Sequence, residues 1–189
     1  MQFSSVNPVL LMFCHEGPWP EVDRIWTIDV NTKQVTQIHP RTMKNETTGH
    51  EWFGKSGKTI WFDLQQPNGE TFFLASYDIA SGNEMKYNVL RNEWGVHYNS
   101  NSTETLFAGD GSDPGDMAKA IDDHWIYIFT PSGDKLTSEK LVNLQHHKYV
   151  LEPNVHFSPD DKWIIFRANF EGEANVYAVE VNLSPQLSP

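Results

Sequence analysis

The sequence predicts an all-β protein, and within that class a β-propeller, from three observations. The same phrase, in which a histidine marks the boundary between a strand and a turn, occurs four times along the 189 residues. Its apolar strands centre on Leu11, Ile60, Leu106 and Ile164, with spacings of 49, 46 and 58 residues. Repeats of about 40 to 50 residues with several short strands are typical of propeller blades. No segment has helical periodicity long enough for an alternation of helices and strands.

The number of repeats predicts about four blades, the lower limit of the roughly 4 to 8 that close a ring. A strand phrase stands at both ends of the chain, so we expect the sheets at both ends to be open. We therefore interpret residues 1–183 as one partial propeller domain of an incomplete ring, and residues 184–189 as a disordered tail.

In the first half of the chain, apolar runs of strand length alternate with polar turns. Residues 1–7 read as a lead-in without a strand, and residues 40–49 as a polar connection. β-branched and aromatic residues with period-two alternation, bounded by Gly, Asn and Ser, indicate the strands. The strands expected here are residues 10–14, 24–30, 34–38, 50–53, 59–63, 71–79 and 84–90.

The second half repeats this plan with one longer interruption. Residues 112–123 form a loop rich in Asp and Gly, in which residues 117–121 are expected to make a helical turn. The strands expected here are residues 97–100, 105–108, 124–129, 139–144, 163–167 and 176–181.

Composition excludes several classes of function. The formal net charge of −11 argues against nucleic-acid or membrane-surface binding, because both surfaces are anionic. No apolar run approaches the roughly 18 residues of a membrane span. The single Cys excludes an internal disulfide framework. Residues 1–20 do not resemble a signal peptide, so we expect a cytoplasmic location. An anionic ligand would need a few focused cations or a metal.

Four histidines stand at the repeated strand boundaries, and equivalent strand ends of a propeller meet at one mouth of its channel. Each of them, taken singly, is explained as well by a histidine that is tolerated in a loop. The four are His15, His50, His97 and His156. The other four histidines lack repeat support and are expected to be surface or linker residues: His39, His124, His146 and His147.

Three further features bear on a binding site. Arg24 either stacks on a Trp or pairs with a carboxylate such as Asp23 or Glu21, or it clamps a ligand carboxylate with its two-pronged guanidinium. Glu152 and Asn154 place two oxygen donors on one side of an extended segment, which suits a divalent ion but also turn capping. Asp110, between two glycines, is interpreted as a turn former.

The sequence contains no phosphate-binding loop, dinucleotide-binding glycine pattern, His-Glu-x-x-His motif or Gly-x-Ser-x-Gly motif. Nucleophilic catalysis through Ser or Cys is therefore unsupported.

Several phrases together resemble the oligogalacturonate lyase family over most of residues 6–182. They are residues 13–19 with 24–26 (Phe-Cys-His-Glu-Gly-Pro-Trp and Arg-Ile-Trp), 50–52 (His-Glu-Trp), 106–111 (Leu-Phe-Ala-Gly-Asp-Gly), 157–160 (Phe-Ser-Pro-Asp), 170–172 (Phe-Glu-Gly) and 177–179 (Tyr-Ala-Val). The resemblance implies a seven-bladed propeller of which this chain looks like the C-terminal half. It implies cleavage of short oligogalacturonides, typically digalacturonate, by β-elimination with a divalent ion, Mn²⁺.

The resemblance also assigns roles by position. His50 corresponds to the base that removes the proton, and Arg24 to the partner that binds or polarises the uronate. His97 corresponds to a metal ligand, and His15 stands in the first motif as a further substrate-binding residue. The remaining family ligands, a Gln and two His, are replaced here by Tyr149, Glu152 and Asn154. Glu152 and Asn154 remain candidate metal ligands by their oxygen donors.

Two other interpretations stay open at this point. The chain could be a TolB-like propeller that recognises a glycan or protein without turning it over, which the changed ligand set favours. It could also be a fragment that is inactive without a missing N-terminal half of the propeller. The expected partner of the enzyme is a small acidic oligosaccharide.

Overall fold

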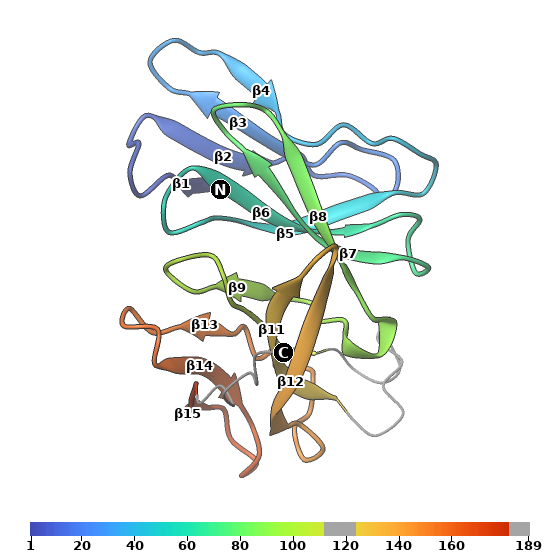
Figure 1. The fold of residues 1–189 in the computed structure, drawn as a ribbon, viewed down its shortest axis with the longest axis vertical. Helices are drawn as coiled ribbons and strands as arrows, with labels where there is room; N and C mark the ends of the chain where they lie inside the picture. The colour runs from blue at the N-terminus through green and yellow to red at the C-terminus, as the bar shows by residue number, and fades with distance from the viewer. Residues whose placement is uncertain (112–123, 182–189) are drawn as a thin grey trace.

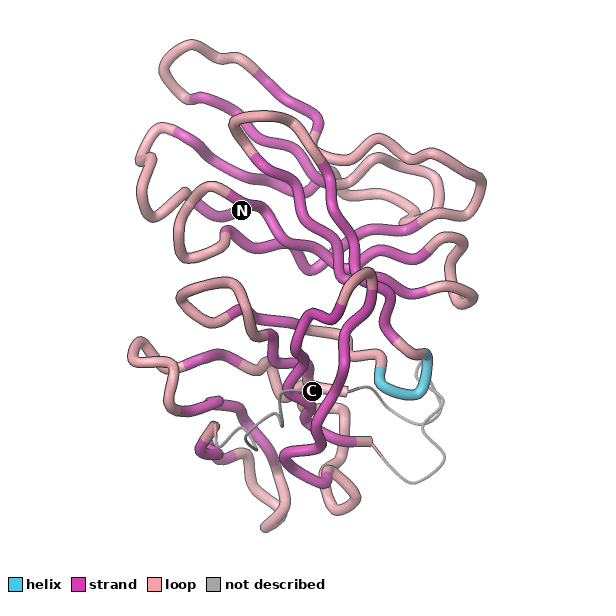
Figure 2. The backbone as a smooth tube through the Cα atoms, in the orientation of Figure 1, coloured by secondary structure: helices cyan, strands magenta, loops and turns pink. Residues whose placement is uncertain are grey.

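The computed structural model describes residues 1–111 and 124–181 and confirms an all-β fold of the propeller type (Figure 1). The expected helical turn at residues 117–121 and the tail at residues 184–189 lie outside the described residues. A single turn of 3-10 helix, η1 (Arg91–Glu93), is the only helix of the described part, and Figure 2 shows it in cyan among the strands. None of the described residues form a helix that could cross a membrane.

The strands of the described residues form four antiparallel units that follow one another along the chain. The first unit contains β1 (Gln2–Phe3), β2 (Leu10–Cys14), β3 (Ile25–Asp29) and β4 (Val35–Gln37). The second contains β5 (Thr47–Phe53), β6 (Thr59–Gln65), β7 (Phe72–Asp78) and β8 (Glu84–Val89). The third contains β9 (Tyr98–Ser100), β10 (Phe107–Gly109), β11 (Trp125–Ser132) and β12 (Lys135–Asn143). The fourth contains β13 (His156–Phe157), β14 (Trp163–Ala168) and β15 (Asn175–Glu180).

The second and third units share one eight-stranded sheet because β8 and β12 meet in parallel at a single residue pair, Asn88 and Lys135. Figure 1 shows the four units one after another along the long axis of the molecule.

The units pack face to face, since their strands carry apolar side chains on both sides. Along β6, Ile60 and Phe62 belong to the core shared with the first unit. Trp61, which points the opposite way, belongs to the core shared with the third unit. A third core joins the third and fourth units through residues such as Ile128 and Ile164. Strands buried on both faces lose the simple alternation of polar and apolar residues, as in other fully covered sheets.

The end of this array is open, as expected. In β14 the side chains alternate between buried and exposed, so within residues 1–111 and 124–181 no sheet covers one face of the fourth unit. Trp163, Ile165 and Val176 are 41%, 37% and 76% exposed there.

The structure corrects several expected boundaries. Residues 1–7 are not a plain lead-in, because β1 pairs with β2 through Gln2 and Phe3. β5 begins at Thr47, inside the expected polar connection, since Thr47, Thr48 and Gly49 pair with β6. β12 begins at Lys135 rather than at residue 139, because the hairpin with β11 continues to its turn.

The second and third units are also joined by the half-buried carboxylate of Glu104. Glu104 Oε1 accepts hydrogen bonds from the Ser56 backbone N–H (3.2 Å) and Oγ–H (2.6 Å), and its Oε2 accepts one from Trp61 Nε1–H (2.8 Å). Burial alone would raise the pKa of Glu104, but the hydrogen bonds from Ser56 and Trp61 outweigh it, so the pKa lies below its usual value.

We therefore expect Glu104→Gln to lower the free energy of unfolding by about 1 kcal/mol at pH 7, since an amide cannot accept at both positions. Because the folded-state pKa of Glu104 is depressed, its contribution is present above the unfolded pKa and disappears as the pH falls through the folded pKa. Urea unfolding at pH 7 and below pH 4.5, the reference pKa of Glu, should show the difference between wild type and variant shrinking in acid. The exposed Glu171→Gln is the matched control, and equal effects of the two variants would contradict the assignment.

Candidate active site

His50 lies in β5 at an irregular point of the strand. The pairing of β5 with β6 shifts register between Gly49 and Trp52, and His50 has φ of 47°, in the left-handed region. This conformation is uncommon for a residue with a side chain and costs on the order of 1 kcal/mol. Strain of this kind is often found at functional sites, so it supports a role for His50 beyond packing.

The lack of a side chain at Gly49 allows the Trp19 ring to lie close to β5. A Cβ there would lie 2.6 Å from the ring of Trp19 and 3.3 Å from Oδ1 of Asp63. The rings of Trp19 and His50 lie 5.4 Å apart between centroids. The absence of a side chain at Gly49 therefore lets the corner between β2 and β3 approach β5.

His50 also faces a carboxylate and a second imidazole. Its Nδ1 lies 3.4 Å from Oδ1 of Asp63, and its ring lies 4.8 Å from that of His97 in an edge-on arrangement. Burial lowers the pKa of His50, but Asp63 and other carboxylates more than offset it, so the pKa is raised above its usual value. Asp63 therefore stabilises the protonated imidazole.

Asp110 holds His97 in place. This carboxylate is 0% exposed and accepts hydrogen bonds from the backbone N–H of Val96 (3.1 Å), His97 (2.8 Å) and Asn154 (3.2 Å). It also lies 2.8 Å from His97 Nδ1 and 3.4 Å from the hydroxyl of Tyr149. The interpretation of Asp110 as a turn former is therefore too limited, because its side chain joins the third and fourth units at the site.

The second nitrogen of His97 points toward the fourth unit. Its Nε2 lies 3.8 Å from Oε2 of Glu152, whose side chain is half exposed. Asn154 has φ of 50° and follows two residues later. Tyr149 donates a hydrogen bond to the carbonyl of Gly111 (2.9 Å) and does not replace a metal ligand.

These residues fit a divalent cation held by few protein ligands. Carboxylate and amide oxygens suit manganese-type ions, and imidazole nitrogen suits other divalent transition metals. A carboxylate behind the other ring nitrogen is the usual support of a metal-binding histidine. His97, Glu152 and Asn154 are the side chains that would hold the ion. Within residues 1–111 and 124–181 there is no group of three or more His, Cys, Asp or Glu side chains arranged to hold a metal.

A hollow of about 190 Å³ runs beside these groups. It is lined by residues of the second, third and fourth units, among them His50, Glu51, His97, Asn154 and His156. Burial raises the pKa of the Glu51 carboxyl above its usual value, although the positive charge of Arg24 favours the carboxylate and acts to lower this pKa. Three of the four repeated histidines thus line one hollow.

Arg24 lies at the other side of Trp19. It is 5% exposed, its guanidinium carbon lies 4.0 Å from the centroid of the Trp19 ring, and Nη1 lies 3.6 Å from Oε2 of Glu16. In the part of the chain that the structure describes, the buried Nε and Nη1 have no hydrogen-bond partner. The expected stacking on a Trp is present, but the neighbouring carboxylate is Glu16, since Asp23 pairs with Arg41 at 3.0 Å.

His15, the fourth repeated histidine, does not share the hollow. Its side chain is exposed, and among the described residues it forms no hydrogen bond or ion pair. Only its backbone N–H, which donates to the carbonyl of Arg24 at 2.7 Å, joins it to the site.

Three histidines that were expected at the surface are buried instead. His39 lies 2.6 Å from Glu46 and 2.9 Å from Glu84. His124 and His147 pack their rings against Tyr149, and His147 Nδ1 also accepts a hydrogen bond from the backbone of residue 169. The expectation fails because their partners come from distant parts of the chain, while His146 is exposed as expected.

Sequence reasoning missed Trp19, Asp63 and the positioning role of Asp110. The pattern Gly-Asp-Gly directly after an apolar strand was the available signal for Asp110. Nothing in the local sequence marks Asp63, because it belongs to an ordinary strand pattern.

Comparison with known proteins gives the family context. The family model described as oligogalacturonate lyase matches residues 4–185. The oligogalacturonide lyase of Pectobacterium atrosepticum and the oligogalacturonate lyase of Dickeya dadantii are each 26% identical over 181 residues, covering 89% of this chain. The alignments cover 46% of each relative, so the chain spans about half the length of these curated relatives.

Solved structures agree on the fold. An oligogalacturonate lyase in complex with manganese superposes with a TM-score of 0.80 at 23% identity, over 95% of this chain and 47% of that protein. The oligogalacturonate lyase from Vibrio parahaemolyticus gives 0.76 at 22% identity, over 92% and 46%. A prolyl endopeptidase gives 0.60 at 11% identity, over 97% and 28%.

The contacts of Asp110 lead to a prediction. Asp110→Asn should lower the free energy of unfolding by about 1–3 kcal/mol, because an amide cannot accept all the N–H donors that surround the carboxylate. It should also release His97, which nitrogen NMR of its ring would detect as loss of the Nδ1-protonated form. Asp134→Asn, in an exposed turn, makes the same chemical change and should alter neither measurement. An Asp110 variant with an unchanged His97 spectrum would contradict the positioning role.

Proposed function

We propose, from the premise that this chain belongs to the oligogalacturonate lyase family, that it forms the proton-abstracting side of a site that cleaves short oligogalacturonides by β-elimination. The observation that supports this most directly is the approach of His50 to His97, at 4.8 Å, with a carboxylate behind each ring. In such a pair, one histidine can remove the proton while the other binds a cation.

His50 is the proposed base. β-Elimination begins with removal of the proton next to the uronate carboxylate, and a neutral imidazole near pH 7 can accept it. The carboxylate of Asp63 stabilises the imidazolium that this transfer produces. The C4 oxygen then leaves, giving an unsaturated uronate without a covalent enzyme intermediate.

Arg24 is proposed to bind the uronate carboxylate. Its guanidinium is held against Trp19 and faces Glu16, a carboxylate on a side chain that is 80% exposed. A ligand carboxylate could take the place of Glu16, because the Glu16 side chain is exposed and its oxygen lies 3.6 Å from the guanidinium. The guanidinium fork would then orient the sugar beside His50.

The proposed cofactor is a divalent metal ion, Mn²⁺, held by His97, Glu152 and Asn154. When bound, it would supply positive charge beside the uronate and make the neighbouring proton easier to remove. Asp110 fixes the ring of His97 so that Nε2 faces Glu152.

The proposal includes a further partner, a polypeptide equivalent to the other half of the relatives. Two observations support it: the chain spans 46% of each curated relative, and one face of the fourth unit is uncovered and apolar. Apolar patches of this kind on a protein surface commonly mark contact sites.

The activity is tested with digalacturonate and Mn²⁺, with ultraviolet absorbance of the unsaturated product as the readout. We expect product from the wild-type chain, supplemented if necessary with the other half of a relative, and a loss of rate of at least about 100-fold in His50→Ala. The exposed His146→Ala should keep the wild-type rate. Binding of digalacturonate without product would favour a propeller that recognises the sugar without cleaving it.

The cation site is tested separately by titrating Mn²⁺ into the protein and recording its electron paramagnetic resonance. His97→Ala and Glu152→Gln should each weaken binding by about tenfold or more, because each removes one of few protein ligands. Glu171→Gln, which removes an exposed carboxylate elsewhere, should leave affinity unchanged. Equal affinity in all four proteins would rule out this ligand set.

A further inference from the structure

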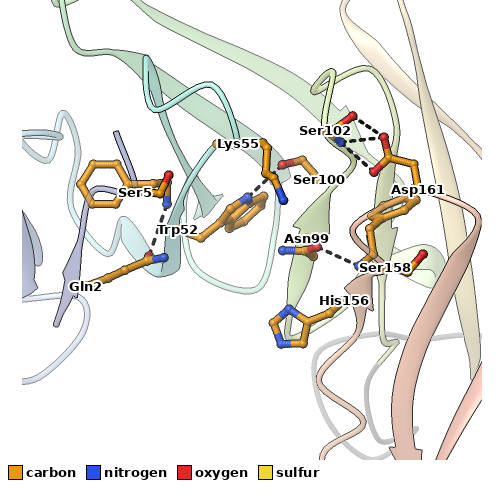
Figure 3. Close-up of a pocket in the computed structure, with 13 residues that line it drawn as sticks. Gln2, Ser5, Trp52, Lys55, Asn99, Ser100, Ser102, His156, Ser158 and Asp161 are labelled. Atoms are coloured by element: carbon orange, nitrogen blue, oxygen red, sulfur yellow. Dashed lines mark hydrogen bonds between the residues drawn. The ribbon is translucent and has the colours of Figure 1, made fainter. Parts of the chain in front are cut away.

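A second hollow, of about 280 Å³, adjoins the first and is drawn in Figure 3. It is lined by residues from the first strands of all four units and from the turns that follow these strands. Trp52, Asn99 and His156 line both hollows, so the two lie next to each other along the inner strands. The second hollow is therefore the place where further residues of a ligand bound in the first would be sought.

Unused hydrogen-bond donors gather in this second hollow. Lys55 is exposed, and its ammonium forms no hydrogen bond or ion pair within the described part of the chain. Gln2 uses its Oε1 to accept from the backbone N–H of Phe53 (3.4 Å), and Asn99 uses its Oδ1 to accept from that of Phe157 (3.0 Å). These two bonds fix the amides and leave their NH₂ groups free for a ligand.

The rest of the lining is polar and already held in place. Trp52 donates from Nε1 to Ser100 Oγ at 3.2 Å, and Figure 3 shows Lys55 beside this pair. The one carboxylate among the lining residues, Asp161, accepts hydrogen bonds from the backbone N–H and hydroxyl of Ser102. Lys55 is therefore the group in this hollow with an uncommitted charge.

A carboxylate-bearing sugar matches these groups better than a neutral apolar ligand. An aromatic edge, amide NH₂ groups and hydroxyls suit sugar hydroxyls, while an ammonium suits a carboxylate. In a chain of net charge −11, an anionic ligand is repelled at long range and must be held by local cations.

We propose that the second hollow binds an additional uronate residue of an acidic oligosaccharide, with Lys55 pairing its carboxylate. This inference rests on the proposed function, since it takes the first hollow as the site of cleavage. Lys55 lies in the turn that follows β5, whereas His50 lies in the middle of β5, and His50 does not line the second hollow. Lys55 is thus beyond the sugar that contacts His50, and the second hollow favours substrates longer than a disaccharide.

The test compares binding of trigalacturonate and digalacturonate to the full chain by calorimetry. Lys55→Gln should weaken trigalacturonate binding by about tenfold, because a charge-assisted hydrogen bond is lost. It should change digalacturonate binding much less. Lys58→Gln is the matched control, since it removes the same charge from the same exposed turn but does not line the hollow. Maltotriose, a neutral trisaccharide, should bind no better to wild type than to Lys55→Gln.

Three results would overturn the proposal: no binding of trigalacturonate by wild type, equal affinity in wild type and Lys55→Gln, or equal losses in Lys55→Gln and Lys58→Gln. Product formation by wild type is measured in the same samples. Binding that depends on Lys55, with no product even when the other half of a relative is added, would refute the proposed lyase activity and leave the second hollow as a uronate site. If the wild type forms product and Lys55→Gln changes neither trigalacturonate binding nor its turnover, the uronate site in the second hollow is refuted and the proposed lyase activity stands.

Discussion

Burial of both faces of each sheet is the constraint on which the rest of this molecule depends. Ile60 and Trp61 are neighbours in one strand, yet they belong to two different cores. The second and third units each share a core with a neighbour on both sides, and the strand order of the chain fixes which units meet. Because the first strands of the units lie side by side, residues about 50 positions apart in sequence, such as His50 and His97, come within contact.

Asp110 holds residues of the site in fixed positions through its hydrogen bonds. A fully buried carboxylate is costly unless it is hydrogen-bonded, and this one satisfies that need with donors from both the third and fourth units. The same bonds orient His97. The left-handed backbone at His50 and Asn154 is another sign that the site is held in position by its surroundings, since both conformations carry strain that the adjoining cores must offset.

Much of this arrangement could be predicted from the sequence, and the failures have a common cause. Repeat spacing predicted the fold class and the order of the strands. Of the four repeated histidines that it placed at one mouth, His50, His97 and His156 line one hollow, whereas His15 does not. Local patterns could not identify β1, which is a strand only because β2 is available to pair with it. They also placed His39 at the surface. Its partners Glu46 and Glu84 come next to it only when the chain is folded, so the local sequence does not reveal them.

The charge of the protein determines how an acidic ligand can be recognised. With a net charge of −11, the chain offers no long-range attraction to a uronate, and at physiological ionic strength such fields fade over about 8 Å. Recognition must then depend on cations at contact distance. Arg24 is a buried cation of the site, with two nitrogens that have no hydrogen-bond partner among the described residues, whereas Lys55 is exposed and has no ion-pair partner there. In the proposed arrangement the two cations have different tasks, with Arg24 beside the proposed site of cleavage and Lys55 at the hollow proposed to bind an additional uronate.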